Sequence, residues 1–259
     1  MLQRLYICLT LGSVCLLGAA LPAAGWTPGT QVTIAHEAAR LSPPDLARQI
    51  EKHRRAFEEG VKAPFSETDP ARHMKNPDGS GSLDRAAFDA VTAAVAAIQG
   101  HQPFEEIVRR LGVVAHYVAD ANNPLAASGA DAEEGRYFAD YLRYVETAEP
   151  RFPLVFYGVQ PGLEAKKDVS PLIVAALRRG REIYPMIGRE YRRIGFISGL
   201  GRFDDRSSAF GAASLAFSHA VTDVTLALRY IWITAGGVDQ RGNLPAGGAR
   251  LTVLPRAAP

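Results

Sequence analysis

The sequence predicts an all-α protein, a bundle of several helices. Three observations lead to this prediction. Apolar residues recur with helical periodicity from end to end, helix start and stop residues bracket the periodic segments, and the alternating patterns of strands are nearly absent. A chain of 259 residues can bury a large core. We therefore expect one helical domain with a short segment on each side of it.

The first 25 residues have the pattern of an export signal. Arg4 precedes an apolar run over residues 5–21, and the small residues Ala23 and Gly25 stand where a signal peptidase needs them. Cleavage after Gly25 would free the α-amine of Trp26. An α-amine titrates near neutrality and can chelate a metal together with its own carbonyl oxygen. The alternative is cleavage a residue or two away, with Trp26 simply packed on the surface.

The composition of the mature chain narrows its function and location. Arg4 is the one charged residue of 1–25, so 28 basic and 27 acidic side chains remain of the 29 and 27 in the full sequence. This balance argues against a nucleic-acid-binding protein, since such domains carry clustered positive charge. Both cysteines, Cys8 and Cys15, lie in the signal, and no later stretch is apolar enough to span a bilayer. We expect a soluble exported protein, periplasmic or secreted, without disulfides.

Helix signals in the first half of the chain define three segments. Ser42 and two prolines open a segment that ends at Gly60, Ser82 can cap one that ends at Gly100, and Pro103 begins one that reaches about Ala121. The first two segments carry apolar stripes that we expect to be buried: Leu46, Ile50, His53 and Phe57 in one, and Phe88, Val91, Val95 and Ile98 in the other.

The second half continues the helical pattern over about residues 132–146, 171–197 and 207–235. The aromatic segment 150–157 is irregular, and we interpret it as a buried connector rather than a loop that contacts lipid. From Gly236 onward Gly, Pro, Ala and Arg dominate. The helical domain is therefore expected to cover 26–238 and a flexible tail to cover 239–259.

The helix that ends near Ala121 carries the candidate chemistry. Its second half, 111–121, is apolar on every face except for His116 and Asp120, which predicts that it is buried. The i, i+4 spacing places both side chains on one face, where they need hydrogen bonds or a metal, because an unpaired buried polar group costs several kcal/mol. A hydrogen-bonded core pair is the alternative to a metal site. His219 and Asp223 repeat the spacing, and we interpret them as such a structural pair.

The stretch from His116 to Pro124, read together with Trp26, resembles the bacterial zinc-dependent phospholipases C and the related fungal zinc-dependent single-strand nucleases. The resemblance implies a helix bundle of the phospholipase C type with three clustered zinc ions that bind and hydrolyse a phosphodiester. It also implies which residues hold the metal. Trp26, His116 and Asp120 match ligand positions of the family, and His73 matches an upstream ligand histidine.

Four other positions depart from the family pattern. Gln31 and Phe65 replace a histidine and an aspartate, and we expect His36 and Asp69 to substitute for them. Beyond Asp120 the family places a further histidine, where this chain has Ala126, and then a histidine and an acid on the next helix, where it has Arg136 and Asp140. An arginine opposes metal binding, which implies the loss of the third zinc ion.

The resemblance therefore implies a smaller centre of one or two zinc ions. The expected metal ligands are Trp26, His36, His73, His116, Asp120 and Asp140. Asp69 and Arg136 are the expected catalytic residues, with Asp69 also available as a fourth ligand to the first ion and Arg136 binding a phosphate oxygen in place of the lost ion.

Two functions follow from this resemblance. The first is an exported zinc-dependent phosphodiesterase that hydrolyses phospholipid headgroup esters or a small phosphodiester. The second is a catalytically inactive member of the family that acts as a binding or structural protein. A nuclease is less favoured, because the near-neutral charge offers little attraction for a polyanion.

Overall fold

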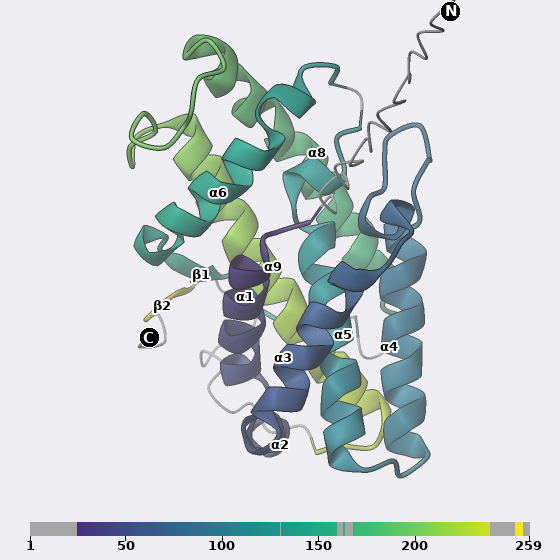
Figure 1. Cartoon of the computed structure of the whole chain (residues 1–259). Coiled ribbons are helices and arrows are strands. Elements are labelled where there is room, and N and C mark those ends of the chain that lie inside the picture. Colours follow the sequence, from purple (N-terminus) through teal and green to yellow (C-terminus); the bar gives the residue numbers. More distant parts are fainter. Residues whose placement is uncertain (1–24, 130, 160–162, 164–167, 239–251, 256–259) are drawn as a thin grey trace, which may run out of the picture.

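The computed structural model describes residues 25–129, 131–159, 163, 168–238 and 252–255. Helices dominate this part of the chain and run along one another as a bundle (Figure 1). Within it, no helix combines the length and the apolar character that crossing a membrane requires. The predicted all-α class is confirmed. Residues 1–24 of the expected export signal and most of the expected tail lie outside the described residues.

The structure gives the bounds of each element as follows. The α-helices are α1 (Pro28–Leu41), α2 (Pro44–Lys52), α3 (Arg54–Lys62), α4 (Leu83–Gln99), α5 (Phe104–Ala121), α6 (Phe138–Ala148), α8 (Ser170–Arg193) and α9 (Ser208–Thr234). Single 3-10 turns are η1 (Ala63–Ser66), η2 (Pro70–His73), η3 (Pro124–Ala126), η4 (Glu134–Arg136) and η5 (Glu149–Arg151). The strands β1 (Leu154–Phe156) and β2 (Thr252–Leu254) pair antiparallel, with Leu154 opposite Leu254.

The helix ends follow local signals, with one helix not predicted at all. α5 begins directly after Pro103 and ends at Ala121, as expected. The Ser207 hydroxyl caps α9 by accepting from the Phe210 amide. α1 was not predicted, although the Thr27 side chain accepts from the Thr30 amide and a proline follows at the first helical position.

Three parts of the fold differ from the sequence prediction. The segment expected to run unbroken to Gly60 is interrupted at His53, which leaves helical backbone geometry between α2 and α3. Phe88 is 44% exposed, because α4 turns its alanine-rich stripe inward, where small side chains let it approach α5 closely. Thr252–Leu254, expected in the tail, forms the strand that pairs with β1.

The central helix is α5, which packs against α1, α3, α4, α8 and α9. It approaches α3 at backbone contact, since a Cβ on Gly60 would overlap the Arg109 carbonyl and a Cβ on Gly112 would overlap the Phe57 carbonyl. This approach carries the end of α3, including Val61, against the buried half of α5.

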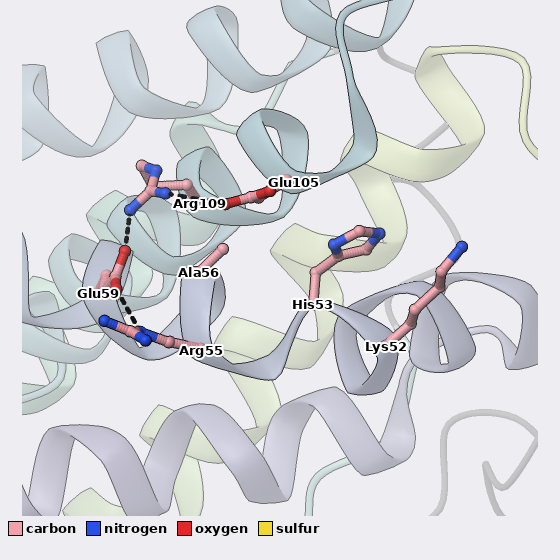
Figure 2. A pocket seen from close by; sticks show the side chains of 7 residues that line it. All are labelled: Lys52, His53, Arg55, Ala56, Glu59, Glu105 and Arg109. Atoms are coloured by element: carbon pink, nitrogen blue, oxygen red, sulfur yellow. Dashed lines mark hydrogen bonds and ion pairs between the residues drawn. The ribbon is translucent and has the colours of Figure 1, made fainter.

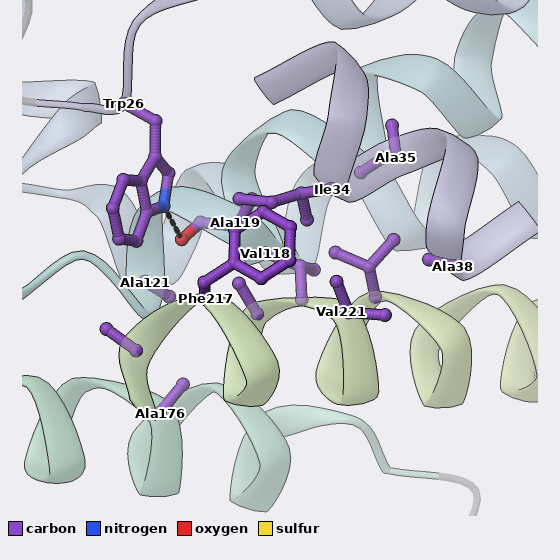
Figure 3. Close-up of a cluster of buried hydrophobic side chains, with 14 of the residues drawn as sticks. Trp26, Ile34, Ala35, Ala38, Val118, Ala119, Ala121, Ala176, Phe217 and Val221 are labelled. Atoms are coloured by element: carbon purple, nitrogen blue, oxygen red, sulfur yellow. Dashed lines mark hydrogen bonds between the residues drawn. The ribbon is translucent and has the colours of Figure 1, made fainter. Parts of the chain in front are cut away.

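Trp26 is buried in the core rather than packed on the surface. Its side chain is 1% exposed, and its indole Nε1 donates to the Ala119 carbonyl at 2.8 Å (Figure 3). This contact ties the beginning of the described chain to the last turn of α5. The residue expected to start the mature protein therefore lies next to the turn that contains Asp120.

Candidate metal centre

Three polar side chains converge in the interior of the bundle. His116 and Asp120 come from one face of α5, and His73 comes from the last residue of η2. His73 Nδ1 lies 2.9 Å from Asp120 Oδ2, and His116 Nε2 lies 3.2 Å from the same oxygen and 3.3 Å from His73 Nδ1. All three residues are at most 1% exposed. This is a group of donor atoms that could hold a metal ion.

The orientation of His116 is fixed by the backbone of α3. Its Nδ1 lies 2.8 Å from the Val61 carbonyl oxygen, which can only accept, so Nδ1 carries the proton. In the neutral ring Nε2 then presents a lone pair toward Asp120 Oδ2, which is also an acceptor. A lone pair and a carboxylate oxygen repel each other in a buried site unless a proton or a metal ion lies between them.

The pKa shifts of His73 and Asp120 follow from the attraction between the imidazoles and the carboxylate. Burial alone would lower the pKa of His73, but the hydrogen bond and the charge of Asp120 raise it above its ordinary value. Burial alone would raise the pKa of Asp120, but His116 and His73 hold it below its usual range. The carboxylate is thus kept ionised, as a metal ligand must be.

The spacing of the three atoms suits zinc. Zinc takes nitrogen and oxygen ligands at about 2.0–2.2 Å in a tetrahedron, whose edges are then about 3.3–3.6 Å. The observed edges of 2.9 and 3.2 Å are shorter than this range and the third, at 3.3 Å, lies at its lower end, so small side-chain movements would open the group to an ion. Two imidazoles and one carboxylate leave a fourth position available.

The second carboxylate oxygen of Asp120 is occupied by Gln31. Gln31 Nε2 donates to Asp120 Oδ1 at 2.6 Å and lies 3.4 Å from the His116 carbonyl. Gln31 Oε1 is buried and has no hydrogen-bond partner among the described residues. Gln31, at the position where the resemblance implies a histidine, therefore holds one oxygen of the Asp120 carboxylate through its side-chain amide.

The chain before Trp26 lies directly against the same carboxylate. A Cβ added at Gly25 would collide with the Asp120 side chain. The peptide that joins Gly25 to Trp26 is therefore within contact range of the group, as expected if the Trp26 amine is to reach it.

An aromatic ring and a carboxylate that the expected ligand set did not include lie beside the two histidines. The rings of Phe65 and His116 are nearly perpendicular, with centroids 4.8 Å apart, and Phe65 stands where the resemblance implies an aspartate. Glu67 Oε2 lies 3.9 Å from His73 Nε2. Glu67 was not among the residues expected from the sequence. It could have been found as an acidic residue only two positions after Phe65, which replaces the expected aspartate.

The structure places His36 and Asp69 outside the three-residue group. His36 stands on α1, stacks on Phe57 and pairs with Glu58 at 3.1 Å. Asp69 is exposed and caps η2, where its carboxylate accepts from the Ala71 amide at 3.0 Å. Each has a local structural role instead.

Arg136 and Asp140 are engaged elsewhere as well. The Arg136 guanidinium lies 3.6 Å from the centroid of the Phe196 ring and pairs with Glu133 at 3.2 Å. Asp140 accepts from the Tyr191 hydroxyl at 2.7 Å and from the Ser198 hydroxyl at 2.7 Å. These hydrogen bonds lower the pKa of Asp140 against the opposing effect of burial. They fasten α6 to the last turn of α8 and to the loop that follows it, and none of them involves the three-residue group.

His219 and Asp223 do not form the expected hydrogen-bonded pair. Asp223 pairs with Arg179 and accepts from Asn122 Nδ2 at 3.1 Å. His219 stacks on Tyr157, with ring centroids 3.8 Å apart. The prediction was wrong because a cation and an amide from other segments satisfy the aspartate better than a neutral imidazole does.

A surface pocket of about 460 Å³ lies at the junction of α2 and α3 beside the first turn of α5. Its lining is mostly charged and shares no residue with the three-residue group, as Figure 2 shows: Lys52, His53, Arg55, Ala56, Glu59, Glu105 and Arg109. Glu59 is held between Arg55 and Arg109. The pocket and the three-residue group are therefore in different parts of the molecule.

The chain is similar in structure to two clostridial alpha-toxins. The similarity to the Clostridium perfringens alpha-toxin of avian strain SWCP has a TM-score of 0.62 at 11% sequence identity and covers 85% of this chain and 66% of the toxin. For the Clostridium absonum alpha-toxin the values are 0.60, 16%, 85% and 67%. The chain thus spans about two thirds of the length of these toxins.

No protein-family model and no curated protein sequence matches the chain. The structural similarity, at this level of identity, establishes the fold. The predicted bundle of the phospholipase C type is confirmed.

Proposed function

We propose that this protein is an exported zinc-dependent phosphodiesterase of the phospholipase C type, with a reduced metal centre that acts on phospholipid headgroup esters. One observation carries the proposal: His73, His116 and Asp120 meet within 2.9–3.3 Å of one another in a buried site of a phospholipase C-like fold. The donor set suits one zinc ion in the first instance.

Neighbouring residues hold the side chains of His116 and Asp120 in position in the absence of a metal ion. Val61 fixes the tautomer of His116, and Gln31 holds one oxygen of Asp120 so that the other points at both imidazoles. A zinc ion held there would supply a Lewis acid for the phosphodiester. The burial of the three ligands excludes water from their side of the site and strengthens their interaction with any cation.

The N-terminus is the proposed source of a further donor. Cleavage after Gly25 would leave the Trp26 amine where the Gly25 peptide now contacts the Asp120 carboxylate. The buried indole, bonded to Ala119, would keep that amine in place after cleavage. This geometry supports export and maturation as part of the same proposal, with the Trp26 amine and carbonyl available to a second ion.

A catalytically inactive binding protein is the second candidate, and specific contacts favour it. Phe65 faces His116 where a further ligand would be needed, Ala126 is wholly buried, and Asp140 is committed to Tyr191. A centre that binds one ion without activating a substrate would satisfy all of these observations.

The deciding experiment measures zinc content and hydrolysis on the same samples. We expect the purified protein to retain about one zinc ion per chain and to hydrolyse a chromogenic phosphocholine ester and phosphatidylcholine in vesicles. Asp120→Asn should lose both properties. Asp223→Asn is the matched control, since it changes another buried aspartate four residues after a histidine, and it should keep its zinc.

The outcomes separate the two candidates. Bound zinc with no hydrolysis of either substrate would support the inactive binding protein. Absence of zinc after refolding with added metal would eliminate both forms of the metal proposal. A version that begins at Trp26 and one that keeps the preceding residues should be compared, and we expect tighter zinc binding when the Trp26 amine is free.

A further inference from the structure

Glu67 is clamped at the edge of the metal centre by two donors. Arg72 Nε donates to Glu67 Oε2 at 2.7 Å, and the Tyr117 hydroxyl donates to Glu67 Oε1 at 2.6 Å. Arg72 also donates to the Tyr117 hydroxyl at 3.0 Å, which closes the arrangement. Tyr117 directly follows the ligand His116 on α5, so the clamp is built on the helix that carries the centre.

The clamp defines the position of the Glu67 carboxylate. The Tyr117 hydroxyl is a donor at neutral pH, because a phenol ordinarily titrates at about pH 10. The Arg72 guanidinium is always protonated. A carboxylate that receives one bond on each oxygen has little freedom to turn away from its neighbours.

His73 lies between two carboxylates, one at each ring nitrogen. Its Nδ1 faces Asp120 and His116, whereas its Nε2 is buried, has no hydrogen-bond partner at ordinary distance and lies 3.9 Å from Glu67 Oε2. A histidine that binds a metal through one nitrogen commonly donates its other N–H to a carboxylate or a backbone carbonyl, which fixes the ring and raises its basicity. The Pro64 carbonyl also lies near the ring.

We propose that Glu67 is the positioning residue that directs His73 Nδ1 at the metal, in a carboxylate–histidine–metal arrangement held by Arg72 and Tyr117. The inference rests on the proposed function in requiring a metal at this site. It also assigns the role of the local acid to Glu67 rather than to Asp69, whose carboxylate caps η2.

The test compares Glu67→Gln with Asp69→Asn. Both substitutions replace a carboxylate by an amide of the same shape, two residues apart, and asparagine can still cap η2. Zinc affinity is measured by competition with a chelator. We expect Glu67→Gln to weaken zinc binding by roughly 10–100-fold and Asp69→Asn by less than about twofold. The His73 Nε2 proton, followed by histidine-selective nitrogen-15 NMR of the zinc-loaded protein, should move upfield in Glu67→Gln only.

Three results would overturn the inference in different ways. Equal zinc affinity and an unchanged His73 proton in the two variants would refute the role of Glu67 and leave the proposed function intact. Failure of the unaltered protein to bind zinc would refute both. If Glu67→Gln does not fold, Tyr117→Phe replaces it, and an affinity that does not fall by on the order of threefold, the worth of one hydrogen bond, would again refute the inference.

Discussion

The helices α5 and α9 each carry a histidine followed four residues later by an aspartate, in His116–Asp120 and His219–Asp223. Both aspartates are buried, at 0% and 2% exposure. In α5 the histidine lies 3.2 Å from its aspartate and a second histidine joins them. In α9 the aspartate pairs with Arg179 instead.

The difference lies in what the neighbouring segments supply. η2 brings His73 to Asp120, and α8 brings the permanently charged Arg179 to Asp223. The first carboxylate lies among imidazole nitrogen atoms that could share a metal ion with it. The second is already paired with the Arg179 guanidinium. The i, i+4 spacing therefore places a histidine and an aspartate on one helix face. The residue that another segment adds, His73 or Arg179, decides whether that face suits a metal.

The strongest test of this comparison removes one histidine from each pair. Loss of a group that only supports a ligand costs 10–100-fold in metal affinity, so His116→Ala, which removes a ligand, should weaken zinc binding by more than about 100-fold. His219→Ala should leave zinc affinity unchanged. Competition titrations on the two variants check this. Similar affinities in both would contradict the distinction between the pairs.

The second test breaks the internal ion pair of α9. Asp223→Ala leaves the Arg179 guanidinium, whose side chain is only 20% exposed, without its partner. Breaking a buried ion pair costs about 3–5 kcal/mol of unfolding free energy. Because Arg179 is partly exposed, we expect a loss at the lower end of this range, about 3 kcal/mol. Urea denaturation measures it. Asp205→Ala, which breaks the exposed pair with Arg151, is the control and should cost less than about 1 kcal/mol.

The third test uses pH to sharpen the contrast. Burial, followed by the charge of Arg179, lowers the pKa of His219 to about 4. A lowered pKa means that the neutral ring stabilises the fold above pH 6.5 and that this stability is lost as the pH falls toward 4. Burial raises the pKa of Asp223 to about 6, which acts in the opposite sense.

Comparison with His219→Gln isolates the histidine, because Asp223 is common to both proteins. Between pH 7 and pH 5 the unaltered protein should lose on the order of 1 kcal/mol more unfolding free energy than the variant, after allowance for solvent screening. Denaturation curves at the two pH values give this difference. Parallel losses would show that His219 is not titrated in this range.

The smallest effect is expected at His36, a third histidine beside an acid. Its contact with Glu58 is partly exposed, so His36→Gln should change stability by less than about 1 kcal/mol. Zinc content should stay the same, because His36 lies outside the group of His73, His116 and Asp120. A fall in zinc content on this substitution would show that His36 is a metal ligand, as expected from the sequence.

The sequence by itself determined the helical class, the bounds of α5 and the buried character of its second half. These properties depend on neighbours along the chain: the proline before Phe104, the apolar residues around His116 and the asparagines after Ala121. It also indicated that His73, His116 and Asp120 belong together, through the family resemblance, and the structure brings them into contact.

Only the tertiary structure decided which polar residues meet. The sequence offered His36 for Gln31 and Asp69 for Phe65 because both are close along the chain, but the fold uses Gln31 itself and places Glu67 beside His73. In the same way, Arg179 reaches Asp223 from 44 residues away. Side-chain partners of this kind depend on how helices cross, and helix crossing depends on contacts such as Gly60 against Gly112, which periodicity along a single helix does not encode.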